Sequence, residues 1–237
     1  MKPVLLILLG GSGTRFGAIK QFLPVSNEIL LTPARRGSPE KMPLFEATLR
    51  QLLAFVDFEA VVIAANDIED QSLQDAKTRL SQSFNQINWV ITAGGSTRHL
   101  SFRAALEAAK NEYSELGCVL IHDANRPYLS EKFLQEINTT CKKVDETSPC
   151  YIPVIAVADS VVKATSDNVV AYENREELFR VQTPQILYYP AIAAYFKELQ
   201  ADSFTDEGSM VLAMNLPVKT YQGDAGNTKI TYKEDLK

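Results

Sequence analysis

The chain has 237 residues, with 24 basic and 29 acidic side chains that give a formal net charge of −5. Its 46% hydrophobic and 22% charged residues are ordinary for a soluble globular protein, and 11 glycines and 11 prolines exclude a collagen-like or low-complexity chain. Three cysteines without a C-x-x-C pair and two histidines favour neither a disulfide framework nor a zinc site. Because the chain is acidic and has no basic block, we expect no nucleic-acid partner.

The apolar run at residues 4–9 resembles a signal peptide at first sight. It is shorter than the usual ~7–15 apolar residues, and it leads into glycines instead of a small-residue cleavage site. Nothing later approaches the ~20 apolar residues that span a bilayer. We therefore interpret the run as a buried strand, and we expect a cytoplasmic protein with no membrane partner, in keeping with its unpaired thiols.

Short apolar runs alternate with helical patterns through the first two thirds of the chain. Apolar residues at helical spacing predict helices around residues 45–56 and over residues 70–84, 99–113 and 130–144. Strands alternating with helices indicate βαβ units, and hence a mostly parallel sheet covered on both faces. No linker divides the chain, so we expect one α/β domain. The expected buried strands are residues 4–9, 61–65, 89–92, 118–122 and 151–157.

Two segments stand apart from this alternation. Residues 26–43 form an irregular stretch with three prolines, in which Arg35 and Arg36 suggest either a solvated loop or a lid over phosphates. Later, residues 161–165 and 169–172 predict a β-hairpin joined through residues 166–168. A two-stranded hairpin is rarely stable alone, so we expect it to pack on another surface.

Ligands of open α/β sheets bind at the carboxyl ends of the strands, and the first such end is rich in glycine. Glycines in the turn at residues 10–17 let backbone N–H groups approach phosphate oxygens. The spacing fits neither the dinucleotide-binding fingerprint nor a P-loop. Arg15 and Lys20 lie close to the turn and favour a polyphosphate ligand over a plain strand-to-helix turn.

Three further strand ends carry polar residues. After the strand at 89–92, Ser96 or Thr97 can cap the next helix, and that helix terminus is also an anion or ribose site. Asp123 leaves a buried strand three residues before Arg126, which is either a structural ion pair or a Mg²⁺ ligand, and its position favours the metal. Lys229 alternates with strand-like residues and, taken alone, indicates a solvated strand face.

Seven motifs follow one another in order over nearly the whole chain. The motifs are Gly11-Ser12-Gly13-Thr14-Arg15, Lys20-Gln21-Phe22-Leu23-Pro24, Gly94-Gly95-Ser96-Thr97-Arg98-x-x-Ser101, His122-Asp123-Ala124-Asn125-Arg126-Pro127, Gln182-Thr183-Pro184-Gln185, Thr205-Asp206-Glu207 and Asn227-Thr228-Lys229-Ile230-Thr231. Together they resemble the 2-C-methyl-D-erythritol 4-phosphate cytidylyltransferase family, of which ribitol-5-phosphate cytidylyltransferase is a close relative. The His-Asp-Ala-x-Arg-Pro and Thr-Pro-Gln motifs are more specific than the glycine turn.

The resemblance implies a three-layer α/β/α Rossmann-like nucleotidyltransferase fold in a single domain over residues 1–237. It also implies a protruding β-arm at about residues 158–175 through which two chains form a homodimer. The implied reaction transfers the cytidylyl group of CTP to 2-C-methyl-D-erythritol 4-phosphate, in isoprenoid precursor synthesis by the non-mevalonate route. The alternatives are a ribitol-5-phosphate cytidylyltransferase, a sugar-1-phosphate nucleotidyltransferase and a catalytically silent nucleotide-binding regulator.

The resemblance also assigns roles by matching position. The implied catalytic residues are Arg15 and Lys20, which face the triphosphate, and Arg175 and Lys229, which face the acceptor. Ser160 joins Arg175 and Lys229 in binding the acceptor's phosphate. Asp123 is implied to hold the cofactor Mg²⁺. The implied nucleotide-binding residues are Gly10, Gly11, Gly13, Gly95, Ser96, Ser101 and Asp123.

The implied chemistry needs no general base. A phosphomonoester has its second pKa near ~6, so the attacking phosphate is mostly a dianion at pH 7. Cations and positioning must then overcome the repulsion between two anions. Three departures from the family pattern leave the acceptor open: Ile19 replaces the usual proline, Asn125 replaces a small Ala or Gly, and residues 26–43 replace a shorter turn.

Overall fold

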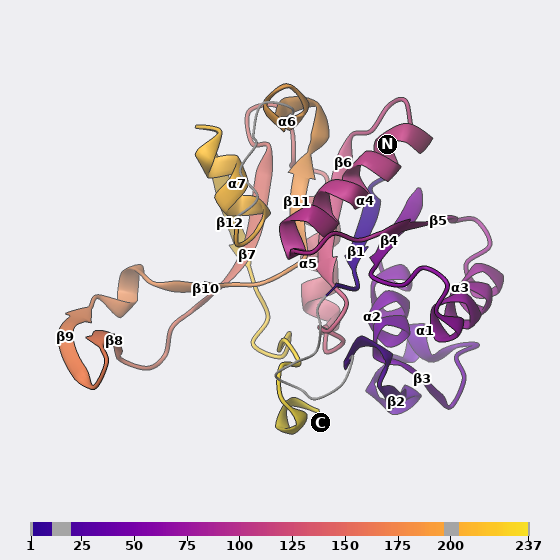
Figure 1. Cartoon of the computed structure of the whole chain (residues 1–237), viewed down its shortest axis with the longest axis horizontal. Helices are drawn as coiled ribbons and strands as arrows, with labels where there is room; N and C mark the ends of the chain where they lie inside the picture. Colours follow the sequence, from indigo (N-terminus) through magenta and orange to yellow (C-terminus); the bar gives the residue numbers. More distant parts are fainter. Residues whose placement is uncertain (1, 11–19, 197–203, 237) are drawn as a thin grey trace.

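The computed structural model describes residues 2–10, 20–196 and 204–236, and within these ranges an eight-stranded mixed sheet forms the centre of the molecule (Figure 1). Seven strands follow the order β10-β7-β11-β6-β1-β4-β5, and β12 pairs with β7. The strands are β1 (Val4–Leu8), β4 (Ala60–Ala65), β5 (Asn88–Ala93), β6 (Cys118–Asp123), β7 (Cys150–Ala156), β10 (Phe179–Val181), β11 (Gln185–Tyr188) and β12 (Val218–Gln222).

One half of the sheet is parallel. Strands β5, β4, β1 and β6 run in the same direction, and Leu8 of β1 lies opposite Ala64 on one side and Asp123 on the other. The side chains of β1 and β4 are buried on both faces, which explains their uninterrupted apolar sequences. The positions of the five strands expected from the sequence are confirmed to within one or two residues, and the carboxyl ends of the four parallel ones meet at one edge. The expected burial of β5 is wrong, because this strand lies at the edge of the sheet and its side chains are only partly buried or exposed.

The other half is mostly antiparallel, so the sheet is more mixed than the sequence alone indicates. Strand β11 runs against both β6 and β7, β10 runs against β7, and β12 returns parallel to β7. Strands β10, β11 and β12 have three to five residues each, too few for a periodicity to be recognised.

Helices cover both faces of the sheet, as the three-layer fold requires. Alternate residues of β1 face opposite layers: Leu5 and Ile7 pack on the side of α2, α3 and α5, whereas Leu6 packs on the side of α4, α6 and α7. Side-chain caps begin α4 at Thr97 and α5 at Ser130. No helix within the described ranges is long and apolar enough to cross a membrane. The helices are α2 (Leu44–Leu53), α3 (Gln71–Ser83), α4 (Arg98–Glu112), α5 (Glu131–Thr140), α6 (Tyr189–Phe196) and α7 (Glu207–Ala213).

Residues 20–43 form a small ordered unit beside α2. Its cohesion comes partly from Arg35, whose guanidinium donates hydrogen bonds to the carbonyls of Asn27, Glu28 and Leu30. Arg35 therefore holds this unit together, which disfavours the lid and makes the segment more ordered than the solvated loop that the sequence suggested. The elements are η1 (Lys20–Phe22), β2 (Pro24–Ser26), η2 (Asn27–Ile29), α1 (Thr32–Arg35) and β3 (Lys41–Pro43), with β2 and β3 paired antiparallel.

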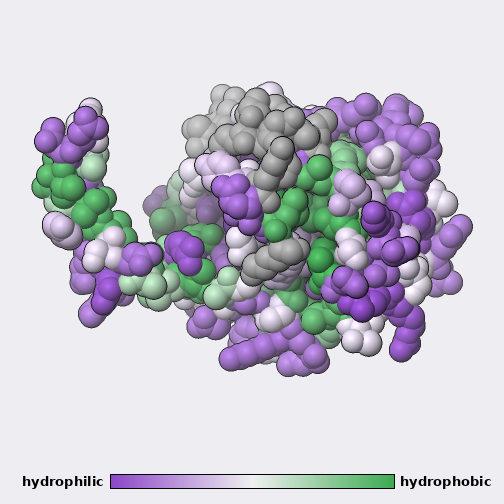
Figure 2. All heavy atoms as spheres, turned by 90° about the horizontal axis from the view of Figure 1, so that it is seen from below, coloured by the Kyte–Doolittle hydropathy of each residue, from purple (hydrophilic) through white to green (hydrophobic). Residues whose placement is uncertain are grey.

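The predicted hairpin is present and extends away from the sheet as an arm (Figure 1). It consists of β8 (Val161–Thr165) and β9 (Asn168–Glu173), followed by η3 (Arg175–Glu177). Figure 2 shows apolar residues gathered along the arm, and Tyr172 is 78% exposed. Residues 223–232, where the sequence suggested a strand around Lys229, contain no strand; they form an irregular segment after β12 that leads to η4 (Lys233–Asp235).

Candidate functional site

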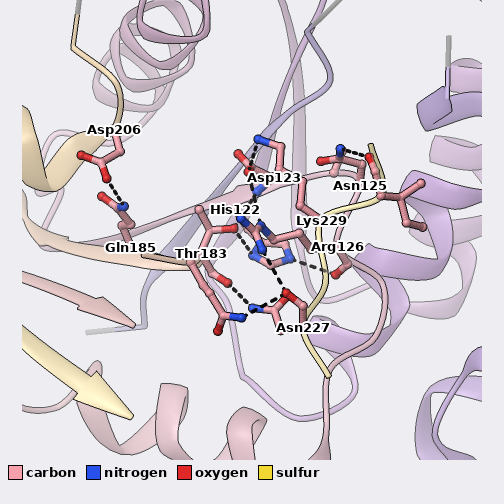
Figure 3. A network of polar contacts seen from close by, with 12 residues as sticks. His122, Asp123, Asn125, Arg126, Thr183, Gln185, Asp206, Asn227 and Lys229 are labelled. Carbon is pink, nitrogen blue, oxygen red and sulfur yellow. Dashed lines mark hydrogen bonds and ion pairs between the residues drawn. The ribbon is translucent and has the colours of Figure 1, made fainter. Parts of the chain in front are cut away.

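Asp123, the last residue of β6, lies at the centre of a charged cluster at the carboxyl edge of the sheet (Figure 3). Its Oδ1 accepts a hydrogen bond from Arg98 Nε at 3.1 Å. Its Oδ2 accepts one from Lys229 Nζ at 2.9 Å and a longer one from Arg126 Nε at 3.4 Å. Residues that lie up to 106 positions apart in the sequence thus converge on one carboxylate.

The electrostatics keep this carboxylate ionised. Burial by itself would raise the pKa of Asp123, but Lys229, Arg98 and Arg126 together lower it well below its ordinary value. Lys229 keeps 43% of its side chain exposed, whereas Asp123 keeps only 8%. Lys229 is therefore the partner that can turn toward a bound anion while Arg98 and Arg126 remain on Asp123.

A second buried carboxylate orients Arg98. Glu207, the first residue of α7, accepts hydrogen bonds from Arg98 Nη1 at 2.6 Å and from Nη2 at 3.0 Å, and it is 1% exposed. Burial lowers the pKa of Arg98, but Glu207 and Asp123 outweigh it and raise that pKa above the ordinary value. Arg98 is thus a fixed, fully charged bridge between Asp123 and α7.

His122 has a structural role in this arrangement. The carbonyl of Arg126 can only accept, so His122 Nε2 carries the ring hydrogen and donates it to that carbonyl at 3.3 Å. Nδ1 of the neutral ring then accepts from the hydroxyl of Thr183 at 3.0 Å, and Thr183 Oγ1 in turn accepts from the backbone N–H of Asp123 at 3.2 Å. Burial lowers the pKa of His122 to about 4, so the ring is neutral at pH 7 and has no free nitrogen to act as a base.

The Gln182-Thr183-Pro184-Gln185 motif joins the segments around the cluster. Gln182 donates to the carbonyl of Asp224 and accepts from its N–H. The carbonyl of Thr183 accepts from Asn227 Nδ2 at 2.8 Å. Gln185 accepts from the N–H of Gly208 at 2.8 Å at the start of α7. The motif therefore fixes both the segment that carries Lys229 and the helix that carries Glu207.

The glycines that follow β1 and β5 lie around Ser101 of α4. Ser101 Oγ accepts a hydrogen bond from the N–H of Gly95 at 3.1 Å. A Cβ on Gly10 would come within 3.2 Å of Ser101 Oγ, and one on Gly95 would lie 2.2 Å from the Cβ of Leu100. Only glycine fits at position 95, because α4 begins directly against it. Gln21 Nε2 donates to the carbonyl of Gly10 at 2.7 Å and brings η1, with Lys20, to the same strand end.

The structure thus brings some of the predicted site residues together and leaves others apart. Asp123 and Lys229 are in direct contact, and Gly10, Gly95 and Ser101 surround the neighbouring strand ends. Ser96 lies between Gly95 and the start of α4. Gly11, Gly13 and Arg15, like Ile19, lie outside the described residues. Ser160 directly precedes β8 and Arg175 begins η3, so both belong to the arm that extends away from the sheet in Figure 1, and Arg175 Nη1 donates to the carbonyl of Ala158 at 2.9 Å.

A family model described as "IspD: 2-C-methyl-D-erythritol 4-phosphate cytidylyltransferase" matches residues 4–237. The chain belongs to this family. The family resemblance, the α/β fold, the cytidylyltransferase class and the expected reaction are thereby confirmed.

Individual members of the family match over nearly their full length. The enzyme of this name from Symbiobacterium thermophilum is 30% identical over 241 residues, covering 99% of this chain and 90% of that protein. The solved structure from Thermus thermophilus has a TM-score of 0.68 at 27% identity and covers 100% of this chain and 96% of that one. The 4-diphosphocytidyl-2C-methyl-D-erythritol synthase of Anaerococcus prevotii shares the fold, with a TM-score of 0.71 at 23% identity and coverage of 99% and 95%.

Sequence reasoning assigned no role to Arg98, Glu207, Gln182 or Asn227, which hold the candidate site together in the structure. Each stands inside one of the seven motifs, so the motifs contained the signal. The motifs do not show which side chains contact each other, because partners such as Arg98 and Glu207 lie 109 positions apart in the sequence.

The carboxylate of Asp123 can bind Mg²⁺ if water and a substrate phosphate supply the remaining ligands. The described residues contain no group of three or more His, Cys, Asp or Glu side chains that could enclose a metal ion. Mg²⁺ needs only one or two carboxylates when water and substrate phosphate supply the other ligands. Oδ1 of Asp123 accepts one hydrogen bond, from Arg98, and keeps a lone pair for a cation. Asp123 therefore fits Mg²⁺ bound together with a nucleotide.

Proposed function

We propose that this chain binds CTP and 2-C-methyl-D-erythritol 4-phosphate side by side along the carboxyl edge of β5, β4, β1 and β6, and there catalyses the family reaction. The observation that carries the proposal is the contact between Asp123 and Lys229. It joins the carboxylate proposed for the nucleotide side to the ammonium proposed for the acceptor side. A nucleotide bound at Asp123 and an acceptor bound at Lys229 would therefore lie next to each other, as two substrates that react must.

The nucleotide side consists of the glycine turns. Gly10, Gly95, Ser96 and Ser101 would bind the base and ribose, with Gly11 and Gly13 continuing the first turn. Arg15 and Lys20 would bind the triphosphate. Asp123 would hold Mg²⁺, which when bound neutralises negative charge on the triphosphate.

The reaction follows from charge placement. An oxygen of the acceptor's phosphate forms a bond to the α-phosphorus of CTP, and the bond from that phosphorus to the bridging oxygen breaks, so pyrophosphate leaves with the electron pair. In the Asp123 cluster, three cations face two carboxylates, which leaves one positive charge in excess for an incoming phosphate. No base is needed, in keeping with the neutral, hydrogen-bonded His122.

The acceptor side requires a second copy of the chain. Ser160 and Arg175 lie on the arm, whereas Lys229 lies beside Asp123. We propose a homodimer in which the arm of one protomer reaches the acceptor site of its partner. The exposed Val169, Val170 and Tyr172 on the arm support this, because an apolar arm is stabilised by a covering surface. We further propose that each chain is one nucleotidyltransferase domain and works in the cytoplasm, as its three free cysteines suggest.

The test is pyrophosphate release from CTP with Mg²⁺ and a panel of polyol phosphates. We expect turnover with 2-C-methyl-D-erythritol 4-phosphate and little with ribitol 5-phosphate or with ATP in place of CTP. Faster turnover with ribitol 5-phosphate than with 2-C-methyl-D-erythritol 4-phosphate would contradict the proposed acceptor. Equal turnover of ATP and CTP would contradict the proposed pyrimidine pocket.

A further inference from the structure

Asn125 joins the turn after β6 to the segment that carries Lys229. Its Nδ2 donates to the carbonyl of Ile230 at 2.7 Å, and its own carbonyl accepts from the N–H of Ile230 at 3.0 Å. Asn125 is 5% exposed and Ile230 is fully buried, so water does not compete for these two hydrogen bonds. Both polar groups of the Ile230 backbone are thus held by Asn125, which Figure 3 shows beside the Asp123 cluster.

Lys229 depends on such contacts because no strand holds its backbone. Residues 223–232 have no sheet partner among the described residues. Upstream, Asn227 is fixed by Thr183, and its carbonyl accepts from Arg126 Nη1 at 2.9 Å. Downstream, Ile230 is fixed by Asn125. Lys229 lies between these two anchors, and its long side chain spans from there to Asp123.

We propose that Asn125 is a positioning residue that aims the Lys229 ammonium at the acceptor's phosphate. The inference rests on the proposed role of Lys229 and adds a residue to which the resemblance assigns no role.

Losing the side-chain donor has a defined physical consequence. In Asn125→Ala the carbonyl of Ile230 would be buried without a donor, which a folded protein avoids by shifting the backbone or admitting water. The backbone hydrogen bond between the two residues would remain, so the segment stays attached while its peptide planes turn. Lys229, one residue away, then loses its direction toward the phosphate.

The experiment compares steady-state kinetics of the full-length wild type, Asn125→Ala, Lys229→Ala and the double variant. We expect Asn125→Ala to raise the KM for 2-C-methyl-D-erythritol 4-phosphate about tenfold, with the KM for CTP within about twofold. In the Lys229→Ala background the same change should add no further rise, because the residue through which it acts is gone. An equal rise in both backgrounds would overturn the proposal.

Thr48→Ala is the matched control. Thr48 Oγ1 donates to the carbonyl of Ala124, the neighbour of Asn125, at 2.9 Å from the fully buried side of α2. Its loss should lower Tm and leave the acceptor KM unchanged. If Asn125→Ala behaves in the same way, Asn125 is merely structural and the proposal is wrong.

Two further outcomes are distinguishable. If Asn125→Ala does not fold, the same comparison is made with Asn125→Ser. This variant keeps a hydroxyl donor, so we expect a smaller rise in the KM for the acceptor. Wild-type protein that releases no pyrophosphate with this acceptor contradicts the proposed function itself. An active wild type whose acceptor KM is unmoved by Asn125→Ala contradicts the positioning role alone.

Discussion

Removing the buried carboxylate of Glu207 tests whether the bridge from α7 through Arg98 supports the site. In Glu207→Ala, Arg98 would lose both hydrogen bonds from Nη1 and Nη2 and keep only the one from Nε to Asp123. Removing one partner of a buried ion pair costs about 3–5 kcal/mol. Two features reduce this figure: the side chain of Arg98 is 25% exposed, and burial raises the pKa of Glu207 despite the opposing charge of Arg98. We therefore expect a loss of about 2 kcal/mol.

For a chain of this size, about 2 kcal/mol corresponds to a fall in Tm of about 4–8 °C, measurable by thermal unfolding. Because Arg98 would no longer be held against Asp123, we also expect kcat/KM to fall about 10- to 100-fold, as is common when a residue behind a metal ligand is lost. The Mg²⁺ titration should shift to higher concentrations.

Glu46→Ala is the matched control for this prediction. Glu46 is also a buried glutamate in the first turn of a helix, and it pairs with Arg50 at 3.0 Å and with Arg79 at 2.6 Å, between α2 and α3. Its removal should lower Tm at least as much and leave kcat/KM unchanged. Equal activity in the two variants would show that the Arg98 bridge serves stability alone, and an unchanged Tm in Glu207→Ala would refute the electrostatic reasoning.

Three further predictions test the remaining assignments. Lys20→Ala should lower kcat together with kcat/KM, whereas Lys229→Ala should chiefly raise the KM for the polyol phosphate, each by about 30- to 1,000-fold. The reverse pattern would show that the two substrates bind in each other's proposed places along the sheet edge. Deleting residues 163–170 should give monomers by light scattering, and a deletion variant that stays dimeric with unchanged turnover would contradict the arm-mediated dimer. Since the pKa of His122 falls from 6.5 to about 4 on folding, the unfolded chain binds its proton first, and stability should drop by about 2–3 kcal/mol between pH 6.5 and 4. Urea unfolding across that range should show a flatter profile for His122→Gln, and identical slopes would remove His122 as the cause.

The sequence by itself determined the elements whose signals are local. Strands β1, β4 and β6 show as apolar runs, because both faces of the sheet are covered there. Helices α3, α4 and α5 show as helical spacing, and the arm shows as two short strand patterns around a turn. The placement of glycines and charges at strand ends follows from the same local patterns, since parallel strands bring their carboxyl ends to one edge.

Tertiary structure decided which side chains meet at that edge. The sequence suggested a solvated strand for Lys229, but its segment has no strand, and its ammonium lies on Asp123, 106 positions away. Likewise, no local sequence pattern predicts that Arg98 contacts Glu207, 109 positions away, or that Asn125 contacts Ile230, 105 positions away. The short strands β10, β11 and β12 form because β7 and β6 offer free edges once the parallel half exists. Such contacts depend on the closure of long loops around a packed core, and no window of neighbouring residues encodes them.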